Sequence, residues 1–253
     1  MLRAARELDD AILHLRNNEK ELGLIEFQTQ GDPAPVVAHE GLLLANKDHW
    51  LANEVLHYWK RVLKRIDMTS RSLVAIVEHG SCFAGPLAEL LWAVDRSYMM
   101  LEDFDGDNRP LATVTLTEGN FGSYPMSNDL TRLETRFLGT PEAVQALKDE
   151  IAEPLEADAA EEHGLITYAY DDIDWEDEVR LFMEERASFS PDAMTGMEAN
   201  LRFAGPETME TRIFGRLTAW QNWIFQRPNA VGEDGALQRY GTGVRGKYNM
   251  ERV

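Results

Sequence analysis

Hydrophobic positions along the chain follow two spacings, one typical of helices and one typical of buried strands. In the first twenty residues, MLRAARELDDAILHLRNNEK, apolar side chains recur every three or four positions, which predicts an amphipathic helix. The same spacing predicts a second helix from about residue 48 to residue 66. Between residues 72 and 78 the segment SLVAIVE is almost wholly apolar, the pattern of a strand that is covered on both faces.

Shorter segments complete a pattern in which strands alternate with helices. Further strands are predicted at residues 24–27, 96–101 and 112–117, a helix at 87–94, and turns at 30–35 and 102–108. The chain after residue 140 is mostly helical, with a strand-like break at 164–168. This alternation predicts an α/β fold with parallel strand pairing. We expect a core in residues 1–168 and a helical C-terminal region in residues 169–253.

Composition and charge narrow the class of protein. The 253 residues contain no apolar run near the roughly 20 residues that a membrane span needs, and the first segment lacks the features of a secretory signal. With a single cysteine, Cys82, no internal disulfide framework is possible, and the six histidines are too scattered for a metal motif. We therefore expect a soluble cytoplasmic protein without a metal site. The net charge of -19 disfavours nucleic acid as a partner but leaves a small anionic ligand possible.

The segment from Glu78 to Pro86 is the most informative for chemistry. It is rich in small residues, follows the buried strand and leads into the predicted helix at 87–94. Such a junction can direct backbone N–H groups and the positive end of the helix into a pocket, where they stabilise a thioester oxygen that gains negative charge. A tight turn that simply requires small residues would give the same pattern, and spacing alone favours that simpler interpretation.

Two carboxylates lie near this segment in the predicted fold. Glu89 is in the first turn of the following helix, and Glu118 ends the strand at 112–117. A pair of carboxyl groups in a partly dry pocket can divide into one acid and one base, because burial and mutual repulsion separate their pKa values. Taken singly, Glu89 also fits an acidic residue favoured by the helix dipole, and Glu118 fits an ordinary loop carboxylate.

These residues resemble the signature of the crotonase (enoyl-CoA hydratase/isomerase) superfamily. The run EHGSCFAGPLAEL at 78–90, followed by Asp95-Arg96, is similar to the family's glycine-rich segment and the strand after it. The run EGNFGSYP at 118–125 is similar to its second landmark, and AAEEHGLI at 159–166 to a third. The resemblance implies a crotonase-like fold of stacked ββα units with a helical C-terminal appendage.

The resemblance also implies roles for individual residues. Glu118 and Glu89 would be the catalytic carboxylates, and the backbone N–H of Gly85 would be one oxyanion-hole donor. The best counterpart of the first oxyanion loop is VAHEGL at 37–42, which places the other donor at Glu40. His79, Phe83 and Phe121 would contact the substrate, an acyl-CoA thioester. This substrate carries its own coenzyme A, so no separate cofactor is expected.

A closer resemblance is to the benzoyl-CoA lyases of this superfamily, which open an epoxidised ring with water. It rests on the segments EHGSCFAG at 78–85, AVDRSY at 93–98 and WQNWIFQRPNA at 220–230. Those enzymes are roughly twice as long, so the chain is expected to be a C-terminal half that works with an upstream crotonase-like half and forms a homo-oligomer. Two alternatives remain open: a generic enoyl-CoA hydratase/isomerase domain, and a non-catalytic half needed for folding and assembly.

Overall fold

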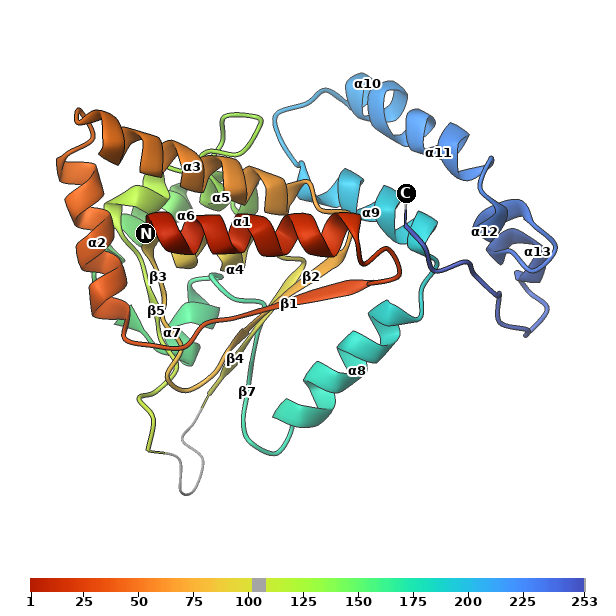
Figure 1. Cartoon of the computed structure of the whole chain (residues 1–253). Helices are drawn as coiled ribbons and strands as arrows, with labels where there is room; N and C mark the ends of the chain where they lie inside the picture. Colours follow the sequence, from red (N-terminus) through yellow and green to blue (C-terminus); the bar gives the residue numbers. More distant parts are fainter. Residues whose placement is uncertain (102–107, 253) are drawn as a thin grey trace.

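The computed structural model describes residues 1–101 and 108–252 (Figure 1). The turn predicted at 102–108 lies almost wholly outside these residues. Within them, two β-sheets form the core of the molecule. None of the helices in this part of the chain combines the length and the apolar character needed to cross a bilayer.

The larger sheet is parallel throughout, as the alternation of strands and helices predicts. Its four strands are arranged in the order β1 (Leu24–Gln28), β2 (Ser72–Val77), β4 (Arg96–Met100) and β7 (Tyr168–Tyr170). Every residue of β2 is buried, because this central strand has a neighbour on each side and helices over its faces. The predicted strands at 24–27, 72–78 and 96–101 are therefore confirmed, and the break at 164–168 precedes β7.

A smaller sheet lies beside the larger one. It contains β3 (Phe83–Ala84), β5 (Val114–Thr115) and β6 (Pro154–Leu155), with β3 and β5 parallel and β5 and β6 antiparallel. Because β3 is parallel to β5, the segments that follow these two strands leave from the same edge of the sheet.

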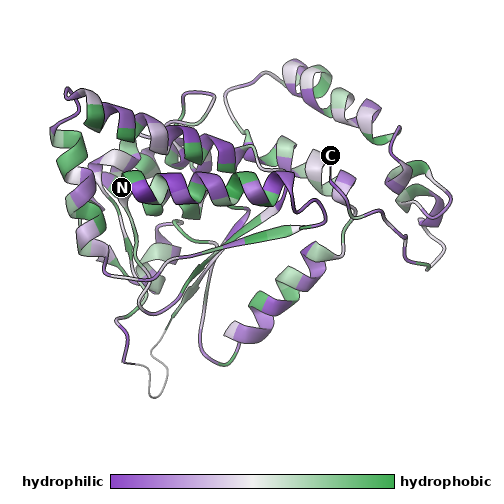
Figure 2. Cartoon of the chain, in the orientation of Figure 1, coloured by the Kyte–Doolittle hydropathy of each residue, from purple (hydrophilic) through white to green (hydrophobic). Residues whose placement is uncertain are grey.

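Two long helices cover one face of the larger sheet (Figure 1). They are α1 (Leu2–Asn17) and α3 (Trp50–Asp67), both close to the predicted ranges. The polar and apolar stripes of α1 are visible in Figure 2. The buried side of α3 repeats at helical spacing and packs on the sheet through Val55, Trp59, Val62, Leu63 and Ile66.

The helix α2 (Pro33–Ala45) corrects the prediction for residues 30–42. The sequence was interpreted there as a turn followed by an oxyanion loop, yet residues 33–45 are helical. Asp32 caps the helix by accepting a hydrogen bond from the backbone N–H of Ala34 at 2.9 Å, and Pro33 occupies the first helical position. An Asp-Pro pair is as typical of a helix start as of a turn, which explains the error.

Short helices lie along the chain between the strands of the two sheets. They are η1 (Gly85–Leu87), α4 (Glu89–Ala93), η2 (Glu118–Phe121), α5 (Arg132–Arg136), α6 (Pro141–Ala146), η3 (Leu147–Glu150) and α7 (Ala157–Glu162). The helix predicted at 87–94 thus corresponds to one 3-10 turn followed by the short α4.

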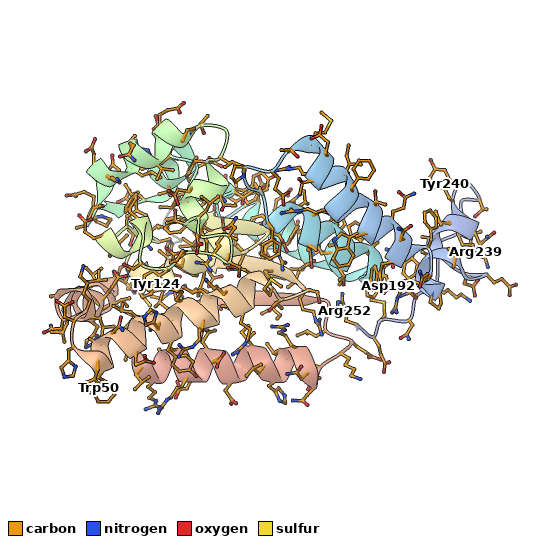
Figure 3. All side chains as sticks on the ribbon, turned by 90° about the horizontal axis from the view of Figure 1, so that it is seen from above. Trp50, Tyr124, Asp192, Arg239, Tyr240 and Arg252 are labelled. Carbon is orange, nitrogen blue, oxygen red and sulfur yellow. The ribbon has the colours of Figure 1, made fainter. Side chains whose placement is uncertain are left out.

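The C-terminal part of the chain is helical, and from α10 onward it extends from the body of the molecule as an arm (Figure 1). Its elements are α8 (Trp175–Ala187), α9 (Pro191–Arg202), α10 (Met209–Thr211), η4 (Arg212–Leu217), α11 (Thr218–Ile224), α12 (Pro228–Val231) and α13 (Ala236–Arg239). Tyr240 lies at the far end of this arm, whereas Arg252 returns to the body and its backbone N–H donates to the carbonyl of Lys20 at 3.0 Å (Figure 3). The predicted domain boundary after residue 168 falls inside β7.

Candidate functional site

Gly85 follows β3 directly and begins the turn that the sequence marks as chemically informative. Its φ angle of +49° is in the left-handed region that glycine adopts without strain. The side chain of Asn120, in η2, donates from Nδ2 to the Gly85 carbonyl oxygen at 2.9 Å. The segments after β3 and β5 are therefore joined here, as the parallel pairing of the two strands requires.

Glu89 begins α4 and is fully buried. Its Oε1 accepts a hydrogen bond from Asn120 Nδ2 at 2.8 Å, and its Oε2 is 2.9 Å from Arg132 Nη1. Burial raises the pKa of Glu89 to about 7, against the opposing effects of Arg132 and Asn120. The carboxylate is thus held by protein groups on both oxygens.

Arg132 connects Glu89 to a second buried acid. Its Nε and Nη2 contact the two carboxylate oxygens of Asp67 at 3.0 and 2.6 Å, and Nη1 also donates to the carbonyl of Tyr124 at 2.9 Å. Burial raises the pKa of Asp67, and the charge of Arg132 opposes this rise. One guanidinium therefore joins two carboxylates in a solvent-free triad, an arrangement that fixes side chains in place.

Glu40 contributes its side chain, and not its backbone, to the same region. It lies inside α2, where its N–H belongs to the helical hydrogen-bond pattern, so the predicted oxyanion donor at Glu40 is not formed. Its carboxyl group instead fills the space between two glycines. A Cβ atom added to Gly85 would lie 2.5 Å from Oε2, and one added to Gly119 would overlap Oε1.

The Glu40 carboxyl is buried, and its hydrogen-bond partners are hydroxyl groups. The Tyr124 hydroxyl donates to Oε1 at 2.8 Å, and only 1% of the Glu40 residue is exposed. Burial raises the pKa of Glu40, and the two groups that oppose the rise are the hydroxyls of Thr117 and Tyr124. Tyr124 is labelled inside the body of the molecule in Figure 3. We call the group formed by Gly85, Glu89, Gly119 and the Glu40 carboxyl the closed site.

Glu118 does not share this environment. It is the first residue of η2 and is exposed, whereas Glu89 is buried. Five cavities of about 190 to 460 Å³ within residues 1–101 and 108–252 are not lined by Gly85, Glu89 or Glu118. Glu89 is enclosed by protein groups, whereas Glu118 lies at the surface, so the two predicted catalytic carboxylates have different surroundings.

The three residues predicted to contact substrate are placed in different surroundings. Phe83 is fully buried in β3, and Phe121 is half-buried in η2 with Lys148 Nζ 5.9 Å from its ring centre. His79 is buried after β2 and lines a separate cavity of about 190 Å³ together with Thr29 and Arg109. The structure therefore does not gather these side chains into one pocket.

The residues that hold the closed site together were not found by sequence reasoning. Asn120 and Tyr124 belong to the run at 118–125 but are not predicted to have a role, and the sequence does not single out Asp67 or Arg132. Arg132 lies 43 residues after Glu89, in a short helix that begins at Thr131 with a capping box. That capping pattern marks the helix start, but nothing local marks the arginine as buried.

Comparisons with known proteins show which fold the chain has and which protein it is related to. No family model matches the chain. Over 252 residues the chain is 50% identical to the benzoyl-CoA-dihydrodiol lyase of Aromatoleum evansii, and the match covers the whole chain but 44% of that protein. The chain thus spans less than half the length of this curated relative.

Solved structures of enoyl-CoA hydratases share the same architecture. That of Geobacillus kaustophilus superposes with a TM-score of 0.71 at 14% identity, covering 99% of this chain and 88% of the other. That of Bacillus anthracis gives 0.69 at 15% identity, covering 99% and 90%. The chain therefore has the crotonase fold predicted from its sequence, and along its whole length it is a relative of part of a benzoyl-CoA-dihydrodiol lyase.

Proposed function

We propose that the chain is the C-terminal half of a lyase that opens the ring of an epoxidised benzoyl-CoA with water, and that this half supports the reaction without performing it. The first part of the proposal is supported by the 50% identity along the whole chain to a benzoyl-CoA-dihydrodiol lyase. The substrate would bring its own coenzyme A, so the proposal requires no further cofactor.

The second part of the proposal, that this half does not perform the reaction, rests on the contacts within the closed site. A catalytic crotonase pocket has to leave space beside its oxyanion donors for a thioester and, in a hydration, for water. Here that space beside Gly85 is filled by the Glu40 carboxyl, and Glu89 is fixed by Arg132 and Asn120. Ionised or neutral, a carboxyl group with both oxygens occupied is poorly placed to move a proton to or from a substrate.

Two other interpretations of the sequence, a generic enoyl-CoA hydratase/isomerase and a half with its own lyase site, are less well supported. A generic enoyl-CoA hydratase or isomerase would need the same pocket to be open. A half with its own lyase site would need Glu89 to leave Arg132, which would leave one buried carboxylate without its cation. The enoyl-CoA hydratase structures, at 14 and 15% identity, support the fold alone.

The proposed partners are an upstream crotonase-like half and further copies of the same protein, in the cytoplasm. The C-terminal arm supports an assembly role because it carries large apolar side chains in solvent. Met209 and Phe214 are 72% and 73% exposed, and Leu217 is 55% exposed. Contiguous exposed apolar residues of this kind mark surfaces that become covered.

The test is turnover of epoxidised benzoyl-CoA by the protein rejoined to its upstream half. In that protein Glu89→Gln and Glu118→Gln should each leave kcat within about 2-fold of the parent, because neither carboxylate would touch the substrate. Glu142→Gln, at an exposed position in α6, is the matched control. A loss of about 100-fold or more in either test variant, with thermal unfolding unchanged, would overturn the non-catalytic role. No turnover by the rejoined parent would overturn the lyase assignment.

A further inference from the structure

A second region of the molecule has open space and an unusual charge. A cavity of about 410 Å³ lies between the start of β4, the helix α5 and the helix α9. It is therefore at the amino end of β4, whereas the closed site follows the carboxyl ends of β3 and β5. We call it the arginine cavity, because five arginines line it: Arg96, Arg132, Arg136, Arg186 and Arg202.

The charge around this cavity is opposite to that of the chain. The five arginines face three carboxylates in the lining, Asp67, Asp95 and Glu198, and a fourth, Glu89, binds Arg132 from outside it. The chain as a whole carries a net charge of -19. Burial raises the pKa of Glu198 to about 7, so near neutral pH even this carboxylate is partly uncharged. A small anion that reaches the cavity therefore meets a local excess of positive charge.

Three of the arginines already have carboxylate partners. Arg132 binds Asp67 at 2.6 Å and Arg202 binds Asp95 at 2.8 Å. Arg186 lies 3.6 Å from Asp95 and 3.7 Å from Glu198. These pairs hold the wall of the cavity together and account for the three carboxylates.

The partners of the other two arginines are mostly neutral. Arg136 is an exposed residue that donates from Nε to the carbonyl of Gly164 and from Nη2 to that of Ile166 at 3.0 Å. Arg96 lies over the Phe182 ring, 4.8 Å from its centre, and over the Tyr168 ring, 5.6 Å from its centre. Carbonyls and rings orient a guanidinium but do not neutralise it, so Arg136 in particular is a positioned cation with its charge available to a ligand.

Apolar side chains form the rest of the lining. Trp92, Met126 and Leu201 face the same cavity, and Leu201 is 69% exposed, so the cavity is open to solvent on that side. A ligand that fits has an oxoanion at one end and an apolar body at the other. Such a combination matches the usual construction of small-molecule sites, in which an apolar surface is combined with a few placed polar groups.

We propose that the arginine cavity binds a small organic anion, with its carboxylate or phosphate oxygens at Arg136 and its apolar body against Trp92, Met126 and Leu201. The site does not require the proposed lyase reaction, although it shares Arg132 with the closed site. It uses Arg136 as the anion anchor because that guanidinium is fixed in direction and has donors left over from its two carbonyl partners.

The experiment is isothermal titration of the chain with benzoate, hexanoate and inorganic phosphate, in Tris chloride at low ionic strength. Benzoate or hexanoate should bind saturably, and Arg136→Gln should weaken that binding about 10-fold, because a charge-assisted contact is lost. Arg180→Gln is the matched control, since Arg180 is an exposed arginine of α8 away from the cavity. Phosphate should bind more weakly than the organic anions.

A second variant guards against a structural effect of the Arg136 change. Leu201→Trp narrows the cavity without altering an arginine and should also weaken binding, whereas Leu217→Trp, on the arm, should not. Thermal unfolding of each variant verifies that it is folded. The proposal is overturned if the parent chain shows no saturable binding of the organic anions, or if both cavity variants bind as the parent does. If phosphate bound as tightly as benzoate, the proposed apolar contacts with Trp92, Met126 and Leu201 would be wrong.

Discussion

The closed site and the arginine cavity share Arg132 and differ in one decisive respect. At the closed site each oxygen of Glu89 and Glu40 lies against a protein group, and the space between the glycines is filled. In the arginine cavity a volume of about 410 Å³ is open, and Arg136 donates to two backbone carbonyl groups.

The comparison shows that buried charge by itself is a poor sign of a working site. Glu89 and Glu198 both have a pKa raised to about 7, yet Glu89 has no space beside it and Glu198 borders a cavity. Arg132 belongs to both regions, because it lines the cavity and also binds Glu89. Changes at these residues can therefore test how far the two regions are independent.

The largest effect is expected from Arg132→Met. It would leave the buried carboxylates of Asp67 and Glu89 without their cation, which should lower the free energy of unfolding by about 3–5 kcal/mol. Urea unfolding of the chain measures this. Arg180→Met, which breaks only exposed ion pairs on α8, should change stability by about 0.5 kcal/mol or less. A loss below about 1 kcal/mol for Arg132→Met would mean that the triad does not organise the closed site.

Glu40→Ala should have the next largest effect. It opens a void between Gly85 and Gly119 and leaves the Tyr124 hydroxyl without its acceptor, which should cost about 1–3 kcal/mol of unfolding free energy. Glu40→Gln keeps the shape and an acceptor oxygen, so it should cost about 1 kcal/mol or less. Denaturant unfolding at one pH compares the two variants. Equal losses would contradict the view that Glu40 fills the site by its volume and hydrogen bonding.

The fold could be predicted from the sequence much better than the closed site. The apolar run at 72–78 predicts β2 because a strand that is covered on both faces carries apolar residues at nearly every position. The helix α2 was missed because its cap and proline were interpreted as a turn. The pairing of Glu89 with Arg132 depends on packing α4 against α5, and no local pattern records a contact across 43 residues. The pairing therefore had to come from the structure.

The pH dependence of stability should show the raised pKa of Glu89. In the folded protein this pKa is about 7, above the ordinary 4.5, so the folded state keeps a proton that the unfolded chain releases between these values. The contribution of Glu89 to stability is full below pH 4.5 and is lost as the pH rises through about 7.

Urea unfolding at several pH values between about 5.5 and 8 measures this loss, which should be on the order of 1–3 kcal/mol. Glu198 titrates in the same direction, so Glu89→Gln should remove only part of the slope, and Glu198→Gln another part. A slope that both single variants leave intact would show that other groups cause it.

The smallest effect is expected at Glu118, the carboxylate that the sequence paired with Glu89. Because Glu118 is exposed at the start of η2, Glu118→Gln should change the free energy of unfolding by about 0.5 kcal/mol or less. Urea unfolding at a single pH measures this change beside that of Glu89→Gln. If Glu118→Gln lowered the free energy of unfolding by more than about 1 kcal/mol, Glu118 would take part in the buried network around Glu89. The closed site would then extend to Glu118, and the separation of the two residues would be wrong.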